Sequence, residues 1–74
     1  MRVLIVEDDP LFAEIIETFL EGKECKTIVA DHLQAAKDQL LISAFDFVLL
    51  DNHLPDGNGI DFVEFIKGLS YEVP

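Results

Sequence analysis

The stretch Val3-Leu4-Ile5-Val6-Glu7-Asp8-Asp9-Pro10 decides the fold of this chain. Its first four residues form a short, β-branched and continuously apolar run, which is typical of a strand covered on both faces in a parallel sheet. Asp9-Pro10 predicts a helix start, because Asp is a good N-cap and Pro suits the first helical position. A buried strand therefore runs into a helix, with Glu7 and Asp8 at the junction.

The same alternation of strand and helix occurs twice more. Thr27–Val29 lies in a second apolar run, and Phe47–Leu50 predicts a third strand that is again apolar on both faces. Segments with apolar residues at helical spacing follow each run. The order β-α-β-α-β-α predicts an α/β fold, a doubly wound parallel sheet with right-handed crossovers.

Local signals predict where the helices begin and end. Gly22 should end the first helix. Asp31–Gln34 can form a capping box for the second, with an acid at the cap and Gln three residues later. Asn52–Gly59 is rich in turn-forming residues and should be a loop, which leaves Ile60–Gly68 for the third helix.

Composition excludes several classes of function. The chain has 74 residues, which limits it to one domain or a piece of one. Its formal net charge of −10 should repel nucleic acid and anionic membranes. No apolar run approaches the roughly 20 residues of a membrane span. We therefore expect no nucleic-acid or membrane partner for this segment. The single Cys25 cannot form an internal disulfide, which agrees with a cytoplasmic protein.

Three acids follow two strands that should be neighbours. Glu7 and Asp8 come just after the first strand, and Asp51 comes just after the third. In doubly wound sheets of strand order 2-1-3 these strands are adjacent, and ligands bind in the crevice outside their carboxyl ends. The three side chains should therefore converge, although more than forty positions separate them.

Carboxylates that close together repel, by about 1–4 kcal/mol for two unit charges 4 Å apart. Mg²⁺ is the natural compensator, because it takes oxygen ligands and is often held by carboxylates and a phosphate. A carboxylate beside bound Mg²⁺ could then attack a phosphoryl group. The structural alternatives are that Asp8 or Asp9 is only a helix N-cap and that Asp51 only caps a turn.

Two motifs resemble those of response-regulator receiver domains. Val3 to Pro10 is similar to the opening of that family, and Leu49-Leu50-Asp51-Asn52-His53-Leu54-Pro55-Asp56-Gly57-Asn58-Gly59 is similar to its phosphoacceptor strand and the following loop. The resemblance covers the whole chain. It implies a flavodoxin-like fold, a module that relays signals rather than a metabolic enzyme, and a phosphohistidine on a sensor histidine kinase or phosphotransfer protein as phosphodonor.

The resemblance also implies a role for each site residue. Asp51 matches the phosphoacceptor. Glu7 and Asp8 match the acidic pair that positions Mg²⁺, with Asp8 the more direct ligand and Glu7 acting through water. His53 matches the position whose backbone carbonyl completes the metal shell, together with Asp51. Its imidazole is not expected to bind zinc, since no second His or Cys lies near it in the sequence.

The sequence departs from the family in one respect. Receiver domains have five strands; the fourth ends in a Ser or Thr that contacts the phosphoryl group, and the fifth carries a Lys that pairs with it. Residues 1–74 match the first three βα units only, so we expect an incomplete receiver domain. Lys67, expected on the third helix, is no substitute. We expect weak, short-lived phosphorylation and a possible homodimer through the unpaired edge of the third strand.

Two other functions fit parts of the sequence. The chain could be a receiver fragment that no longer accepts phosphate and acts as a protein-interaction or dimerisation module. It could also be a Mg²⁺-dependent phosphatase of the aspartyl-phosphate type. That class would place a second acid two residues after the nucleophile, where this chain has His53.

Overall fold

Strand β1 (Arg2–Val6) is the centre of a parallel sheet. The computed structural model describes residues 1–51 and 53–67. In it, β1 pairs on one edge with β2 (Lys26–Ala30) and on the other with β3 (Phe47–Leu50), which gives the order β2-β1-β3. Val3 to Val6 are all at most 3% exposed, so β1 is covered on both faces as its sequence predicts.

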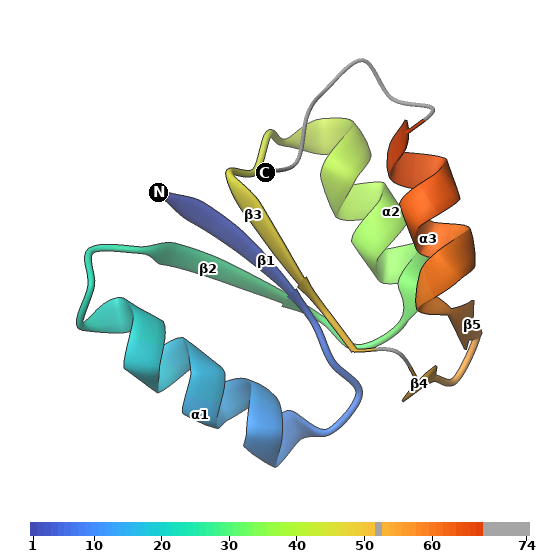
Figure 1. Cartoon of the computed structure of the whole chain (residues 1–74). Coiled ribbons are helices and arrows are strands. Elements are labelled where there is room, and N and C mark those ends of the chain that lie inside the picture. The colour runs from blue at the N-terminus through green and yellow to red at the C-terminus, as the bar shows by residue number, and fades with distance from the viewer. Residues whose placement is uncertain (52, 68–74) are drawn as a thin grey trace.

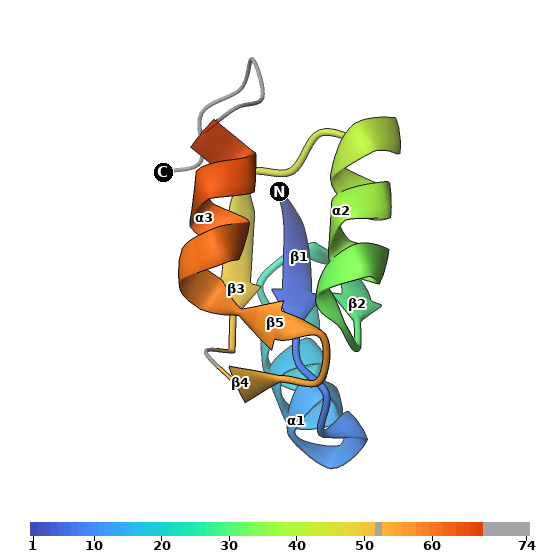
Figure 2. The ribbon, with the colours of Figure 1, turned by 90° about the vertical axis from the view of Figure 1, so that its right-hand side faces the viewer.

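Helices cover the two faces of the sheet unequally. Helix α1 (Pro10–Glu21) lies on one face, and α2 (Leu33–Ile42) and α3 (Gly59–Lys67) lie together on the other (Figures 1 and 2). The main core is on the side of the two helices, where Leu4 of β1, Ala36 of α2 and Phe62 of α3 are each 0% exposed. The strand order and the alternation of elements are as predicted.

The expectation that β3 is covered on both faces is wrong for the described residues. Val48 and Leu50 are half-buried and pack against the core, whereas Phe47 and Leu49 are 39% and 41% exposed. Because successive side chains point to opposite faces of a strand, the exposed pair lies on the α1 side of the sheet. Helix α1 packs mainly against β2 and does not reach across to shield them.

The start of α1 is as predicted, and its end differs in detail. Oδ1 of Asp9 accepts hydrogen bonds from the backbone N–H groups of Leu11 (3.0 Å) and Phe12 (3.4 Å). Gly22 ends the helix in a right-handed conformation, with φ −69°. The left-handed residue of the turn is Glu24, with φ 59°. No helix among the described residues is long and apolar enough to cross a membrane.

The predicted capping box at α2 does not form. Oδ1 of Asp31 lies 2.6 Å from Nδ1 of its neighbour His32, which occupies the N-cap position and makes no side-chain cap bond. The side chain of Gln34 donates instead to Asp38. The cap is supplied by Asp56, whose carboxylate accepts the first N–H groups of the helix from more than twenty residues away.

Residues 53–58 form a short hairpin, where the sequence predicts an irregular loop. Strand β4 (His53–Leu54) pairs antiparallel with β5 (Gly57–Asn58), and Pro55-Asp56 forms the turn between them. This hairpin lies at the carboxyl ends of the parallel strands, below the start of α2 (Figure 2). Leu54 is only 8% exposed and belongs to the core. Helix α3 follows at once, and the predicted helical residue Gly68 lies outside the described residues.

Candidate metal centre

Backbone hydrogen bonds place the first residue after each strand. Val6 of β1 is in register with Ala30 of β2 and Leu50 of β3. One step further, the N–H of Glu7 donates to the carbonyl of Ala30 and the N–H of Asp51 donates to the carbonyl of Val6, each at 2.9 Å. The ladder thus continues past both strand ends and fixes the backbone of two of the three acids.

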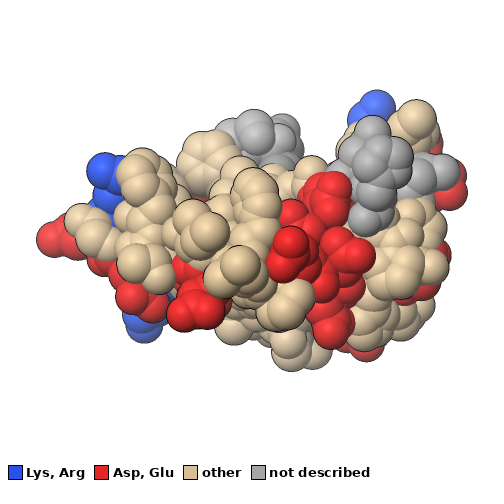
Figure 3. Space-filling model, turned by 90° about the horizontal axis from the view of Figure 1, so that it is seen from below, with Lys and Arg blue, Asp and Glu red and all other residues tan. Residues whose placement is uncertain are grey.

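The three acids converge, as the strand order predicts. Glu7, Asp8 and Asp51 each offer a carboxylate oxygen, and these oxygens all lie within 4.8 Å of one another. Glu7 and Asp51 are half-buried and Asp8 is exposed. Seen from the end where the parallel strands terminate, acidic side chains gather in a band near the middle of the molecule (Figure 3).

Proximity changes the acidity of Glu7. Partial burial is the largest cause that raises the pKa of Glu7 above its ordinary value, followed by the hydrogen bond that it shares with the Asp51 carboxyl. The backbone N–H of Asp9 donates to Oε2 of Glu7 at 3.3 Å and partly offsets this rise in pKa. Because of this raised pKa, Glu7 holds its proton more readily than an isolated glutamate would.

The donor set fits a hard divalent cation. All three side chains offer oxygen, and none offers the nitrogen or sulfur that softer metals prefer. Mg²⁺ keeps several waters and is usually held by only one or two carboxylates, so a cluster at the surface suits it. The role of the His53 carbonyl stays a prediction; its backbone lies in β4, and its side chain is outside the described part of the structure.

Two hollows border the acidic cluster. One, of about 250 Å³, lies between α1 and β3, and its lining includes Glu7, Asp51 and Phe12. The other, of about 450 Å³, lies toward β2, and its lining includes Glu7, Asp8 and Asp31. Glu7 contributes to both, so the cluster is accessible from either side of the β1–α1 junction.

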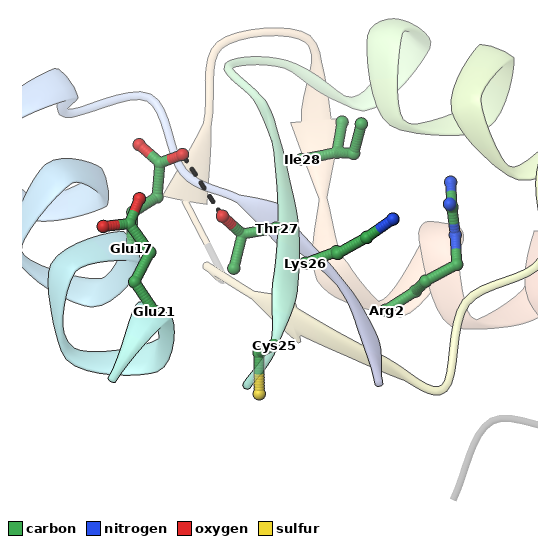
Figure 4. A pocket seen from close by; sticks show the side chains of 7 residues that line it. All are labelled: Arg2, Glu17, Glu21, Cys25, Lys26, Thr27 and Ile28. Carbon is green, nitrogen blue, oxygen red and sulfur yellow. Dashed lines mark hydrogen bonds between the residues drawn. The ribbon is translucent and has the colours of Figure 1, made fainter. Parts of the chain in front are cut away.

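A third hollow, of about 420 Å³, lies away from the cluster, over the edge of β2 (Figure 4). Glu17 and Glu21 approach it from α1, while Arg2 and Lys26 extend on the opposite side of the β2 ribbon. The hydroxyl of Thr27 donates to Glu17 at 3.4 Å. Cys25 is half-buried and precedes β2, and its thiol donates to the Lys23 carbonyl at 3.6 Å. These groups form no convergent set.

Sequence reasoning missed that Asp56 caps helix α2. Oδ1 and Oδ2 of Asp56 accept hydrogen bonds from the N–H groups of Leu33 (2.6 Å) and Gln34 (2.9 Å). In the sequence, Asp56 is only a turn residue, and Asp31 is the obvious cap for α2. No local signal distinguishes the two acids, because the choice depends on how the hairpin packs.

Comparisons with known proteins agree on one family. A family model described as the response regulator receiver domain matches residues 3–74. The transcriptional regulatory protein CitB of Klebsiella pneumoniae is 39% identical over 74 residues, which cover 97% of this chain and 32% of CitB. The response regulator protein PilR of Pseudomonas aeruginosa is 34% identical over 73 residues, which cover 99% of this chain and 16% of PilR.

Solved structures give the same answer. The non-phosphorylated receiver domain of HemR from Leptospira biflexa matches with a TM-score of 0.90 and 37% identity, over 99% of this chain and 59% of that one. The MaeR response regulator bound to beryllium trifluoride matches with a TM-score of 0.84 and 36% identity, over 90% of this chain and 57% of that one.

The sheet order β2-β1-β3 with its three helices corresponds to the first βα units of the flavodoxin-like fold of these receiver domains. The chain spans 32% of the length of CitB and 16% of that of PilR, so the match concerns one part of those proteins. Because the family model covers nearly every residue and the relatives and structures agree with it, this protein belongs to the family of response regulator receiver domains, which are signalling modules of two-component systems.

Proposed function

We propose that this chain accepts a phosphoryl group on Asp51, with Mg²⁺ held by Glu7, Asp8 and Asp51. The observation that carries the proposal is the convergence of the three carboxylates within 4.8 Å at the ends of adjacent strands. The proposed donor is a phosphohistidine on a sensor histidine kinase or a phosphotransfer protein. In two-component signalling such a transfer moves one phosphoryl group from protein to protein.

The chemistry assigned to each residue follows from its position. A carboxylate oxygen of Asp51 attacks phosphorus, the bond from phosphorus to the histidine nitrogen breaks, and an acyl phosphate forms. Bound Mg²⁺ supplies positive charge to the phosphoryl oxygens during the transfer. Asp8 is assigned as the direct ligand, Glu7 as a ligand through water, and the backbone carbonyl of His53 as a further oxygen donor.

A relative supports this assignment. MaeR, which is 36% identical to this chain, is a response regulator bound to beryllium trifluoride. Beryllium trifluoride has the shape and charge of a phosphoryl group, so its binding to a relative is consistent with phosphoryl chemistry here. We further propose that the chain acts in the cytoplasm, binds neither nucleic acid nor membrane through this segment, and turns over no external metabolite.

Magnesium binding is the first test. We expect Mg²⁺ to bind the 74-residue chain at one site, and Asp8→Ala or Asp51→Ala to weaken binding by more than about tenfold, because each removes a direct oxygen ligand. Isothermal titration calorimetry measures the affinity. Glu14→Ala removes an exposed acid from the middle of α1 and should leave it unchanged. If the wild-type chain binds no Mg²⁺, the alternative of an interaction module that no longer accepts phosphate is favoured.

Stability without metal is the second test. The raised pKa means that native Glu7 keeps its proton at pH values where the unfolded chain has lost it, so its ionisation destabilises the fold above about pH 4.5. We expect Glu7→Gln to raise the free energy of unfolding at pH 7 by about 1 kcal/mol, by removing one charge from the cluster. The gain should vanish below pH 4.5, where Glu7 is protonated in both states.

Urea denaturation followed by circular dichroism measures this difference. Saturating Mg²⁺ should make the wild-type chain the more stable of the two, because the stabilisation by a ligand grows with the logarithm of its affinity for the folded state. If Glu7→Gln is no more stable than wild type at pH 7 without metal, repulsion among the carboxylates does not lower the free energy of unfolding.

Phosphorylation is the third test. We expect a small-molecule phosphodonor with Mg²⁺ to add one phosphoryl group, and Asp51→Asn to abolish the addition. In the isolated polypeptide of residues 1–74 the label should be weak and short-lived, because none of these residues matches the Ser or Thr and the Lys of the family, and one such donor is typically worth about 10²–10³ in rate. Mass spectrometry with hydroxylamine cleavage identifies the acyl phosphate, and Asp46→Asn is the control. A long-lived label on Asp51 would contradict the expected need for these groups.

One edge of β3 is not paired by any described residue, and we propose that two copies of this polypeptide associate through it. Among residues 1–51 and 53–67, β3 pairs only with β1. Phe47 and Leu49 are exposed beside its open edge, and such an edge readily pairs with another chain. The net charge of −10 opposes association, so salt should strengthen it by screening.

Sedimentation velocity tests this association. We expect the average mass to rise with protein concentration and with salt, and Leu49→Lys to restore the monomer, since an edge lysine blocks strand pairing. Leu41→Lys places the same charge on an exposed apolar residue of α2, which is 65% exposed and away from the edge, and should have no effect. A monomer at every concentration, with the β3 amide protons protected from exchange, would refute the proposal.

A further inference from the structure

We propose that Asp56 is a positioning residue for the metal centre, because its carboxylate ties the β4–β5 hairpin to the first turn of α2 and so holds the segment that follows Asp51. The inference rests on the proposed function. It adds a residue outside the cluster of three carboxylates, and it assigns that residue no contact with the metal.

The contact is a bidentate cap made across the fold. Oδ1 of Asp56 accepts the N–H of Leu33 at 2.6 Å, and Oδ2 accepts the N–H of Gln34 at 2.9 Å. These N–H groups have no partner within the helix, and the N-cap residue His32 makes no side-chain cap bond. The start of α2 therefore takes its cap from the hairpin, and the hairpin is anchored on α2.

The cap favours the charged carboxylate. The N–H of Leu33, and next that of Gln34, lower the pKa of Asp56 below its ordinary value, with a smaller contribution from His32. The amino end of a helix also carries partial positive charge, which attracts an anion. Asp56 thus stays ionised at neutral pH, and both oxygens are available as acceptors.

Described residues on both sides of residue 52 are held by contacts with the rest of the fold. At one end, the N–H of Asp51 donates to Val6 at 2.9 Å. In the middle, Leu54 is 8% exposed within the core. Beyond the cap, Gly57 comes so near to α2 that an added Cβ would lie 2.7 Å from Cδ1 of Leu33. Asp56 completes this set of contacts by joining the hairpin to α2 through two hydrogen bonds.

Two roles of Asp56, a cap that only stabilises α2 and a residue that positions the metal centre, predict different Mg²⁺ affinities for a variant that lacks its carboxylate. If Asp56 only stabilises α2, its loss lowers stability and leaves the Mg²⁺ affinity of the folded chain unchanged. If it holds the Asp51 segment in its binding geometry, its loss lowers the affinity as well. Groups that orient metal ligands from outside the ligand set typically change affinity by about ten- to a hundredfold.

The experiment compares Mg²⁺ affinity in the wild-type chain, Asp56→Ala and Asp56→Asn, with folding checked by circular dichroism. We expect Asp56→Ala to bind about tenfold more weakly. Asp56→Asn keeps one acceptor oxygen and should fall between the other two. Loss of charge alone would weaken both variants equally, and the loss would disappear at about 1 M salt, where the screening length is about 3 Å.

Asp46→Ala is the matched control. It removes the same charge and a contact of the same kind, because Oδ2 of Asp46 accepts the backbone N–H of Arg2 at 2.7 Å. This contact lies at the amino ends of β1 and β3, the opposite end of the sheet from the acidic cluster. We expect it to lower stability without changing the Mg²⁺ affinity.

Hydrogen exchange gives a second readout that does not require a variant to fold. If the cap and the metal centre are coupled, saturating Mg²⁺ must slow exchange of the Leu33 and Gln34 amide protons, since coupling between two sites is reciprocal. Unchanged exchange, or a folded Asp56→Ala chain that binds Mg²⁺ with wild-type affinity, overturns the inference about Asp56. The proposed function still stands in that case, provided that Asp51→Ala abolishes Mg²⁺ binding. A wild-type chain that binds no Mg²⁺ overturns both.

Discussion

Backbone hydrogen bonds along both edges of β1, to the parallel strands β2 and β3, fix where the strands end and therefore where the acidic side chains lie. Val6 faces Ala30 on one side and Leu50 on the other, so the residues that follow emerge at one end of the sheet. A slip of one residue in either register would turn each side chain of the shifted strand to the opposite face. Val3 to Val6 of β1 are apolar and buried between Arg2 and Glu7, so a slip would move a charged residue into the core, and the position of Asp51 beside Glu7 depends on this register.

The convergence of like charges at that point opposes the stability of the fold. Burial and the contact with Asp51 raise the pKa of Glu7, so ionisation of this carboxyl is less favourable than in a free glutamate. A protein selected for stability alone would separate these groups or replace one of them. Under the proposed function, a bound cation offsets this repulsion, and its binding favours release of the proton from Glu7.

Much of this arrangement could be predicted from sequence, because it depends on local or periodic signals. The apolar run of β1, the Asp9-Pro10 start of α1 and the alternation of elements give the sheet and its order, and the order brings Asp51 to Glu7 and Asp8. The cap of α2 could not be predicted, since Asp31 satisfies the same local rule as Asp56 and only tertiary packing decides between them. The exposure of Phe47 and Leu49 was missed because an apolar strand gives no sign of how far the neighbouring helix reaches.

The bond from Asp56 to α2 also bears on the order of folding. It joins residues 22 and 23 positions apart, in the second and third βα units. Contacts between distant segments form only after the intervening chain has been ordered, whereas a helix and its neighbouring strand can associate early. We therefore expect the first two units to collapse as a nucleus around β1, and the hairpin to dock last. Asp51, the proposed phosphoacceptor, would have its following segment fixed only in that closing step.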